Sequence, residues 1–392
     1  MPHIYGLDAA TTQLSNQAAG LASEVLAKHA ADVDAKARFP EESVAALAKA
    51  GFYGLCVPAA LGGKGQGPRA FAAVVEELAR GCASTAMIYV MHVSAQQAIG
   101  TSPTLQGKDE LLREIAAGKH LSTLALSEKG SRSQFWAPVS KLTAAPSVDG
   151  FTTSAQKSWV TSARRADSYV STAQKPGAAS PLESTTYLMR PKAHPGQIKM
   201  SASFDGLGLR GNESLSVTLE SWPVAKADLV SALGEGAKTK LEVILPWFSV
   251  GTAAMANGLC RAAVEATAKH LTETKFEHTG TGLRDLPTLR ARLAQMSVRT
   301  EQARALLAYT IGEMENPSAT TPLFVLQTRL ASLEAAVDVT DLAMKACGGA
   351  AFSKQLPVDR IFRDARAGWV MAPTVDHLND FVGKALTGLP LF

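Results

Sequence analysis

Apolar residues recur at three- and four-residue intervals over residues 11–50, which is the spacing of the buried face of an amphipathic helix. The residues on that face are Leu14, Ala18, Leu21, Val25 and Ala31. Glycine-rich segments at 51–65 interrupt the pattern, and further helices are expected over 69–81, 84–100 and 107–119. Residues 84–100 are almost uniformly apolar, so this helix should be buried on all sides. The first third of the chain therefore predicts a helical region.

The pattern changes to short β-type runs in the middle of the chain. Between residues 124 and 162 these runs alternate with turn signals, one of which is 146–150, as in a compact antiparallel meander. Further strands are expected over 167–173, 185–190 and 215–219. The middle of the chain therefore predicts a β region.

Helical periodicity returns after residue 237. Long amphipathic segments are expected over 240–274, 285–313, 322–347 and 375–386. Their faces are too apolar for isolated helices in water, so we expect them to pack against one another as a bundle.

Composition narrows the class of protein. Of the 392 residues, 46% are apolar and 19% are charged, which is ordinary for a soluble globular protein and unlike a disordered one. No run approaches the roughly 20 apolar residues that span a bilayer, and the N-terminus lacks a basic segment followed by an apolar core. We therefore expect a cytoplasmic protein without a membrane segment.

Charge and cysteine content argue against two further classes. The formal net charge of +4 is small and dispersed, which disfavours nucleic acid as a partner but suits a polyanionic ligand such as coenzyme A. The cysteines, Cys56, Cys82, Cys260 and Cys347, show no metal-ligand spacing. We expect them to be buried thiols and expect no metal site.

Two segments of the β region and one near the C-terminus carry a family resemblance. Residues 125–133 read ALSEKGSRS, residues 149–162 read DGFTTSAQKSWVTS, and an Ala-Asp pair follows at 166–167. Residues 348–366 read GGAAFSKQLPVDRIFRDAR. In this order the segments resemble motifs of the acyl-CoA dehydrogenase superfamily, and the likeness extends over nearly the full chain.

The resemblance implies an α+β multidomain fold of the acyl-CoA dehydrogenase type. It implies an N-terminal helical domain over 1–120, a middle β-barrel domain that contacts the flavin over 121–232, and a C-terminal four-helix bundle over 233–392. In this family the bundle also builds the oligomer. A homotetramer or homodimer is therefore expected.

A flavin cofactor is also implied by the resemblance. The expected cofactor is FAD, with FMN left open because the diphosphate-binding loop departs from the family pattern at 277–280. An isoalloxazine ring needs hydrogen-bond partners along its pyrimidine edge and an apolar wall over its face. Carried over by position, the cofactor-binding residues are Leu126, Ser127, Ser133, Trp159, Thr161, Ser162, Lys345, Gly348, Gly349 and Thr374.

The catalytic base of the family is missing from this chain. Dehydrogenation between the α and β carbons requires a carboxylate that takes the α-proton while the flavin takes the β-hydride. The glutamate of the family aligns with Ala372, and the alternative position used by some branches aligns with Phe248. Asp376, His92 and Glu242 are candidate replacements, although core packing or surface charge is the simpler interpretation of each.

Several functions therefore stay open. The first is a flavin-dependent oxidoreductase that acts on the CH–CH group of an acyl-CoA thioester with a displaced or atypical base, passing electrons to an acceptor. The second is a monooxygenase that receives reduced FMN or FAD from a partner reductase and needs no such base. A non-redox acyl-CoA lyase is a variant of the first. A flavin-holding protein associated with DNA is the third, and the dispersed charge argues against it.

Overall fold

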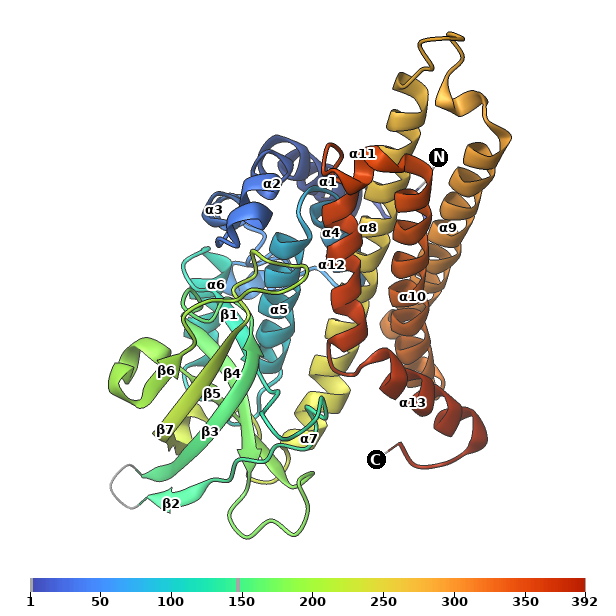
Figure 1. Ribbon diagram of the computed structural model, residues 1–392. Coiled ribbons are helices and arrows are strands. Elements are labelled where there is room, and N and C mark those ends of the chain that lie inside the picture. Colours follow the sequence, from blue (N-terminus) through green and yellow to red (C-terminus); the bar gives the residue numbers. More distant parts are fainter. Residues whose placement is uncertain (1–2, 146–148, 392) are drawn as a thin grey trace.

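A computed structural model describes residues 3–145 and 149–391 of the chain. Its first third is helical, as predicted (Figure 1). The helices are α1 (Ala9–Leu21), a π-helical turn (Ala22–Leu26), α2 (Ala27–Lys36), α3 (Glu41–Lys49), α4 (Pro68–Gly81), α5 (Ala83–Gly100) and α6 (Lys108–Ala116). Helix α5 is buried on nearly all sides, as its apolar sequence predicted, and it contacts α4, α8 and β1. It therefore connects the helical and β parts of the molecule.

The middle of the chain forms two sheets. The first has the strand order β1 (Ser122–Ala125), β4 (Ser168–Gln174), β5 (Ser184–Met189), and the second has the order β2 (Thr143–Ala145), β3 (Gly150–Val160), β7 (Leu215–Ala225), β6 (Ile198–Met200). An isolated bridge between Glu128 and Lys157 links the segment after β1 to the second sheet.

One detail of the predicted β region was wrong. Strand β1 pairs in parallel with β4, with Ser122 opposite Ser168, so the segment from β1 to β3 is not an antiparallel meander. Parallel pairing needs a long connection between the strands, and β2 and β3 of the other sheet supply it. The turn expected at 146–150 lies partly outside the described residues.

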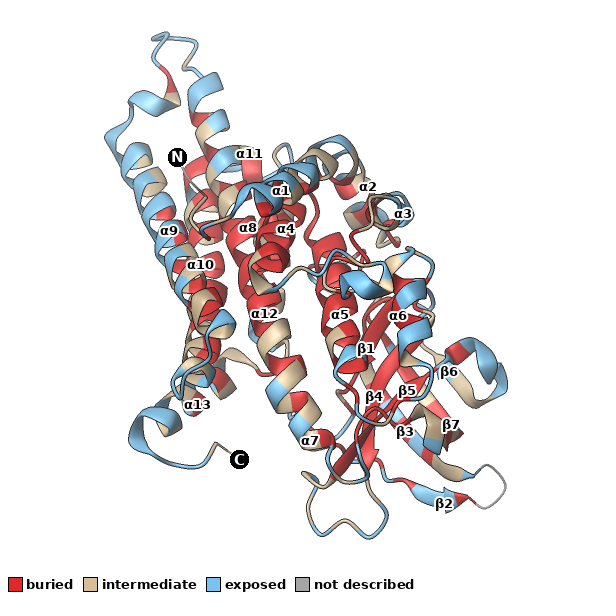
Figure 2. Ribbon diagram, turned by 180° about the vertical axis from the view of Figure 1, so that it is seen from behind, coloured by how far each residue is buried: buried red, intermediate tan, exposed pale blue. Residues whose placement is uncertain are grey.

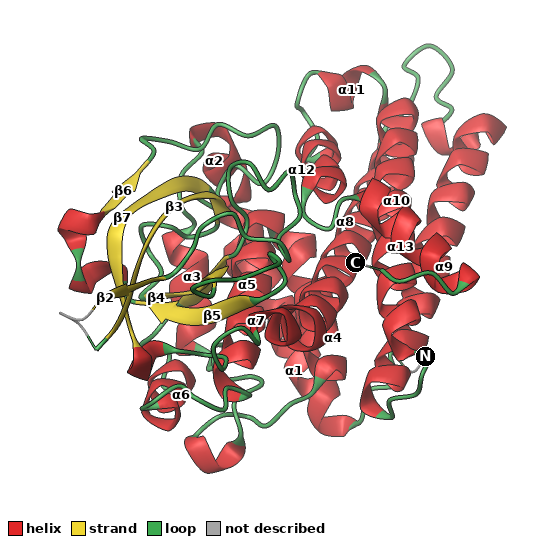
Figure 3. Cartoon of the chain, turned by 90° about the horizontal axis from the view of Figure 1, so that it is seen from below, coloured by secondary structure: helices red, strands yellow, loops and turns green. Residues whose placement is uncertain are grey.

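The C-terminal part is helical. It comprises α7 (Gly236–Lys238), a π-helical segment (Thr239–Ile244), α8 (Leu245–Glu273), α9 (Pro287–Glu315), α10 (Thr321–Cys347), α11 (Gly349–Phe352), α12 (Val358–Val370) and α13 (Val375–Thr387). Short 3₁₀ turns connect elements at Ala59–Leu61, Pro191–Ala193, Pro195–Gln197, Lys226–Asp228 and Leu283–Asp285. Helices α8, α9, α10 and α12 pack as a bundle, and Figure 3 shows the strands gathered on the opposite side of the molecule.

The predicted order of a helical part, a β part and a helical bundle is confirmed. The strands of the described residues all lie between residues 122 and 225, although the domain boundaries after 120 and 232 stay a prediction. Helix α8 reaches α4 closely enough to require glycine, because a Cβ at Gly258 would lie 2.4 Å from the Glu76 carbonyl oxygen.

Helix α8 belongs to the one described segment that is long and apolar enough to cross a membrane, Gly236–Glu273. The sequence pattern did not indicate such a segment. Within the fold, 83% of its most apolar stretch is buried against other elements, and Figure 2 shows α8 buried at the centre of the helices. Its apolar composition is therefore accounted for by its central position. The expectation of a cytoplasmic protein stays a prediction.

Candidate functional site

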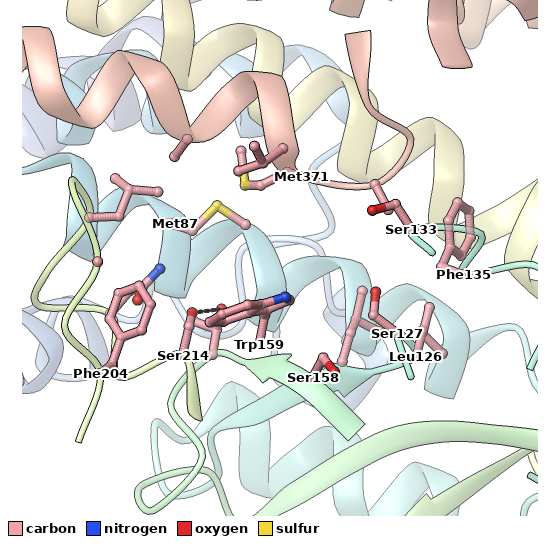
Figure 4. A pocket seen from close by; sticks show the side chains of 18 of the residues that line it. Met87, Leu126, Ser127, Ser133, Phe135, Ser158, Trp159, Phe204, Ser214 and Met371 are labelled. Atoms are coloured by element: carbon pink, nitrogen blue, oxygen red, sulfur yellow. Dashed lines mark hydrogen bonds between the residues drawn. The ribbon is translucent and has the colours of Figure 1, made fainter. Parts of the chain in front are cut away.

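A cavity of about 1280 Å³ lies where the β part meets the helices. Helix α5, the start of α8 and the end of α12 form one side of it, and the segments after β1 and around Trp159 form the other (Figure 4). The loop at 201–209 lines it as well. A cavity of this size at a junction of domains is where a cofactor and a substrate are expected to bind.

The loop after β1 presents backbone donors and positive charge to the cavity. Gly130, Arg132 and Ser133 have φ angles of 97°, 51° and 67°, in the left-handed region. The N–H groups of Arg132 and Ser133 donate to no other residue in the described part of the chain. Lys129 and Arg132 add two cationic side chains to the lining. Free N–H groups in such a conformation, together with cations, favour an anion such as a diphosphate.

A β-bulge turns Trp159 into the cavity. The register of β3 against β7 shifts between Lys157 and Val160, and Trp159 within the shift has a φ of 59°. An extra residue in one strand re-aims the side chains beside it. The indole is 65% exposed in a chain whose other large aromatic residues are mostly buried, and Figure 4 shows it flat along one wall. It therefore supplies an aromatic wall for a planar ring.

Polar groups line the cavity beside Trp159. Ser127, Ser158, Thr161 and Ser214 contribute hydroxyl groups, and Thr161 Oγ1 lies 3.1 Å from Ser214 Oγ. Asn212 also lines the cavity, and its side-chain oxygen is buried without a partner among the described residues. Buried polar atoms are usually hydrogen-bonded, so this oxygen is available to a ligand. The polar edge and the aromatic wall together suit an isoalloxazine ring.

A buried ion pair holds the cavity loop to the sheet. Lys157 Nζ donates to Glu128 Oε1 at 2.6 Å and to the Thr172 carbonyl oxygen at 2.7 Å. Glu128 Oε2 accepts from the backbone N–H groups of Val139 and Ser140 at 2.6 and 2.8 Å. Burial raises the pKa of Glu128, but the charge of Lys157 and the hydrogen bonds outweigh burial and hold the pKa below its usual range. The carboxylate of Glu128 is therefore stabilised in its deprotonated form and is unsuited to take a proton.

The helical wall of the cavity is mostly apolar, although Arg366 of α12 also lines it. Its apolar side chains include Met87, Met91, Ile244, Leu245, Phe248, Met371 and Ala372. Besides Glu128, the lining contains one described carboxylate, Asp205, which lies in an exposed loop and pairs with Arg210 at 2.5 Å. No described carboxylate in the lining is therefore both sheltered and free to act as a base.

The three candidate bases lie outside the cavity lining. His92 has 0% exposure, and its Nε2 and Nδ1 lie 3.2 Å from the Tyr53 carbonyl oxygen and 3.1 Å from the Ser122 backbone nitrogen. Burial lowers the pKa of His92 to about 4. Glu242 is exposed beside α8, and Asp376 is exposed in the first turn of α13. The core interpretation of His92 and the surface interpretation of the other two agree with these positions.

The predicted cofactor residues fall into two groups. Leu126, Ser127, Ser133, Trp159 and Thr161 line the cavity. Ser162 is buried next to this group, and its N–H donates to the Asn212 carbonyl oxygen at 2.9 Å. Their roles toward a flavin stay a prediction.

The second group lies away from the cavity of the same chain. Lys345, Gly348 and Gly349 are exposed at the end of α10. Thr374 caps α13, and its hydroxyl accepts from the His377 backbone N–H. None of the four lines the cavity, and their roles toward a cofactor stay a prediction.

Several residues of the site had no assigned role in the sequence analysis. Ser214, Asn212 and Phe204 line the cavity from the loop before β7, and Met87 and Met91 do so from α5. Met87 and Met91 lie four residues apart, so a helical wheel could have grouped them. The loop residues carried no comparable signal, because only the tertiary structure brings them beside Trp159.

Replacing Trp159 by alanine is expected to weaken flavin binding about tenfold or more, because the variant loses the aromatic wall. Trp159→Phe keeps an aromatic face and should bind within a few-fold of the unchanged protein. The measurement is the dissociation constant from the quenching of flavin fluorescence. Equal affinities for all three proteins would contradict the assigned role of the indole.

Comparison with known proteins shows which family shares the sequence patterns and the fold of this chain. Residues 8–119 match the family model described as "Acyl-CoA dehydrogenase, N-terminal domain", and residues 234–386 match "Acyl-CoA dehydrogenase, C-terminal domain". Together these ranges make up more than half of the chain. The chain is 28% identical over 342 residues to the mitochondrial short-chain specific acyl-CoA dehydrogenase of Bos taurus, covering 86% of this chain and 80% of the relative.

Two solved structures show how far the fold is shared. A glutaryl-coenzyme A dehydrogenase in complex with glutaryl-CoA superimposes with a TM-score of 0.90 at 22% identity, covering 98% of this chain and 97% of the other. Butyryl-CoA dehydrogenase from Megasphaera elsdenii has a TM-score of 0.90 at 22% identity, covering 97% and 99%. At these identities the structures establish the likeness of fold alone.

Proposed function

The chain belongs to the acyl-CoA dehydrogenase family, and from this premise we propose that it oxidises the CH–CH group of an acyl-CoA thioester without a carboxylate at the family's usual position. It is a flavoprotein oxidoreductase, and its cofactor is FAD. The observation that carries the proposal is the single cavity in which the aromatic wall of Trp159 and its polar neighbours face an apolar helical wall. Family membership does not specify the substrate, the base or the electron acceptor, so these belong to the proposal.

The residues of the cavity fit the cofactor. The loop at 129–133 offers free N–H groups and two cations, which suits a diphosphate. Trp159 and the hydroxyl groups of Ser127 and Thr161 suit the ring and its polar edge. FAD, when bound, supplies a two-electron acceptor for a hydride from the substrate.

The protein's own residues have two tasks in this proposal. Met87, Met91 and Leu245 exclude water from the acyl group, which keeps the reacting carbons in an environment of low dielectric constant. The ion pair of Glu128 and Lys157 keeps the loop at 129–140 against the sheet, so that the polar edge stays in place. Holding the reacting groups in the correct orientation accounts for a large part of the rate enhancement of many enzymes.

Proton removal is the step for which the cavity is poorly equipped. Ala372 and Phe248, which the family resemblance aligns with the two positions of the base, both line the cavity, and Glu128 is paired with Lys157. We propose that the α-proton leaves to a basic group that the substrate itself carries, and that turnover is slow because no positioned protein base takes it. A positioned general base contributes about 10² to 10⁴ in rate.

Two alternative functions are compatible with the same cavity. A monooxygenase that uses reduced flavin, or a non-redox acyl-CoA lyase, would also tolerate Ala372. Family membership does not favour either of them, and the experiment below separates them from the first proposal.

The proposal predicts that an acyl-CoA will bleach the oxidised flavin. FAD is first identified after release from the purified protein. The holoprotein is then titrated anaerobically with short, branched and aromatic acyl-CoAs while the absorbance near ~450 nm is followed, because loss of this band reports a hydride arriving on the flavin. Bleaching supports dehydrogenation. Thioester turnover without bleaching indicates a lyase, and an oxygenated product that forms only with reduced flavin and oxygen indicates a monooxygenase.

A further inference from the structure

Asp364 of α12 is a buried carboxylate that lies outside the cavity lining. It is 4% exposed, and its Oδ1 accepts the backbone N–H of Leu209 at 2.7 Å. Burial raises its pKa to about 6, while the hydrogen bond from Leu209 and the charge of Arg360 oppose the increase. The side chain is therefore ionised in neutral solution, and its charge is directed at the backbone of a loop.

The other buried carboxylates of the described chain are paired with cations. Glu76 and Glu77 each lie 2.6 Å from Arg261, and Glu128 lies 2.6 Å from Lys157. Asp364 forms no such ion pair in the part of the chain that the structure describes. A buried charge without a close counter-charge is costly, so the hydrogen bond to Leu209 calls for an explanation.

Leu209 belongs to a loop that forms one wall of the cavity. Phe204, Leu209 and Asn212 of this loop line the cavity, and the Phe204 ring lies 6.3 Å from the Trp159 ring (Figure 4). Leu209 has a φ of 50°, in the left-handed region. A residue with a branched side chain keeps this conformation only where its surroundings fix it. Asp364 fixes it by binding the Leu209 N–H.

A chain of backbone hydrogen bonds runs from Leu209 to the turn that carries Trp159. The Asn212 N–H donates to the Leu209 carbonyl oxygen at 3.0 Å, and the Ser162 N–H donates to the Asn212 carbonyl oxygen at 2.9 Å. Ser162 follows Thr161, which lines the cavity. Three hydrogen bonds in series thus connect the buried carboxylate to the polar edge of the cavity, and bonds in such a series strengthen one another.

The same loop is fixed against α12 and α2 by further contacts. Arg363 Nη1 donates to the Leu207 carbonyl oxygen at 3.1 Å and to Asp34 Oδ1 at 2.8 Å. Arg210 Nε donates to the Asp34 carbonyl oxygen at 2.8 Å. A Cβ at Gly208 would lie 2.3 Å from the Arg363 carbonyl oxygen, so the backbones of the loop and of α12 are in direct contact. Helix α12 therefore sets the position of this wall.

We propose that Asp364 is a positioning residue for the cofactor: through Leu209 and Asn212 it keeps the turn at 159–162 where that turn can contact the flavin ring. The inference goes beyond the proposed function, because it holds for any reaction that the bound flavin performs. It uses the predicted contact of Trp159 with the ring, which the Trp159→Ala variant tests separately.

The test measures backbone hydrogen exchange in the FAD-loaded protein and the dissociation constant of FAD. Asp364→Ala removes the acceptor of the Leu209 N–H, so exchange in 159–163 and in 205–213 should become about tenfold faster or more, and FAD should bind about tenfold more weakly. Asp364→Asn keeps an oxygen that accepts the same hydrogen bond. It should stay within a few-fold of the unchanged protein in both measurements.

Asp359→Asn is the matched control. Asp359 lies on the same helix and pairs with Arg363 at 3.0 Å, but it does not bind the N–H of Leu209, so both measurements should stay unchanged. Exchange in α9 is the reference for general stability and should also be unchanged in Asp364→Ala. If Asp364→Ala does not fold, Gly208→Ala pushes the loop away from α12 and should give the same two effects.

Three results would overturn the inference. The first is faster exchange in 205–213 with no change in 159–163 or in FAD affinity, because the effect would then stop at the loop. The second is an equal increase in α9, which would indicate a general loss of stability. The third is an Asp364→Asn variant as impaired as Asp364→Ala. Failure of every acyl-CoA to bleach the flavin would overturn the proposed function alone, since neither measurement uses a substrate.

Discussion

Replacing Ala372 by glutamate is expected to increase the rate of flavin bleaching by a bound acyl-CoA by about 10²-fold or more, within the range of about 10² to 10⁴ that a positioned general base provides. Ala372 lines the apolar wall of the cavity, between Met371 and the segment that leads into α13. A carboxylate there would face the acyl group in surroundings that exclude water. The measurement is single-turnover reduction of the flavin in an anaerobic stopped-flow instrument.

Ala372→Gln is the matched control, because it has the size of glutamate but cannot take the proton. It should react no faster than the unchanged protein. Equal rates for the two variants would show that the effect is one of shape, and no gain with either would count against proton removal as the slow step.

Replacing Glu128 by glutamine is expected to lower the free energy of unfolding by about 3 to 5 kcal/mol, because it leaves Lys157 as an uncompensated charge. The ion pair is almost completely buried, with side-chain exposures of 0% for Lys157 and 3% for Glu128. The same carboxylate also accepts the backbone N–H groups of Val139 and Ser140. The measurement is urea denaturation followed by circular dichroism.

Glu220→Gln is the control for this variant. Glu220 pairs with Lys199 at 2.7 Å, but the two side chains are 53% and 68% exposed, so the loss should stay below about 1 kcal/mol. A similar loss for both variants would contradict the role of burial. The double variant Glu128→Gln with Lys157→Met should recover part of the stability, because it removes the unpaired charge.

The ion pair also predicts a pH dependence. The pKa of Glu128 is lower in the folded chain than in the unfolded one, so its stabilisation is fully present above the unfolded pKa of about 4.3. The stabilisation is lost as the pH falls further, through the folded pKa. The difference in stability between the unchanged protein and Glu128→Gln should therefore shrink in acid.

Much of the fold followed from local patterns. The periodicity at 240–274 and 322–347 and the apolar run at 84–100 predicted helices that the structure contains as α8, α10 and α5. A helix repeats every 3.6 residues, so a buried face leaves a pattern that can be recognised without knowledge of its neighbours. The parallel pairing of β1 with β4 left no such pattern, because it depends on which strand lies beside β1 in space.

The candidate site was predictable where a motif carried it. Trp159, Ser127 and Thr161 were assigned from the family resemblance, and all three line the cavity, while their roles toward FAD stay a prediction. The reason that Trp159 points into the cavity was not predictable. It follows from a register shift between β3 and β7, which are about 55 to 75 residues apart along the chain.

By itself the sequence determined the three-part architecture and the flavin motifs, because each depends on residue identity and local spacing, while the replacement of the family's base by Ala372 stays a prediction. Only the tertiary structure decided that Glu128 is held by Lys157, that His92 is a core residue, and that Arg329 is buried against Phe248. Charge on a side chain is evident from the sequence. Whether that charge is solvated, paired or buried alone depends on neighbours from distant segments, and these contacts set its energy and its chemistry.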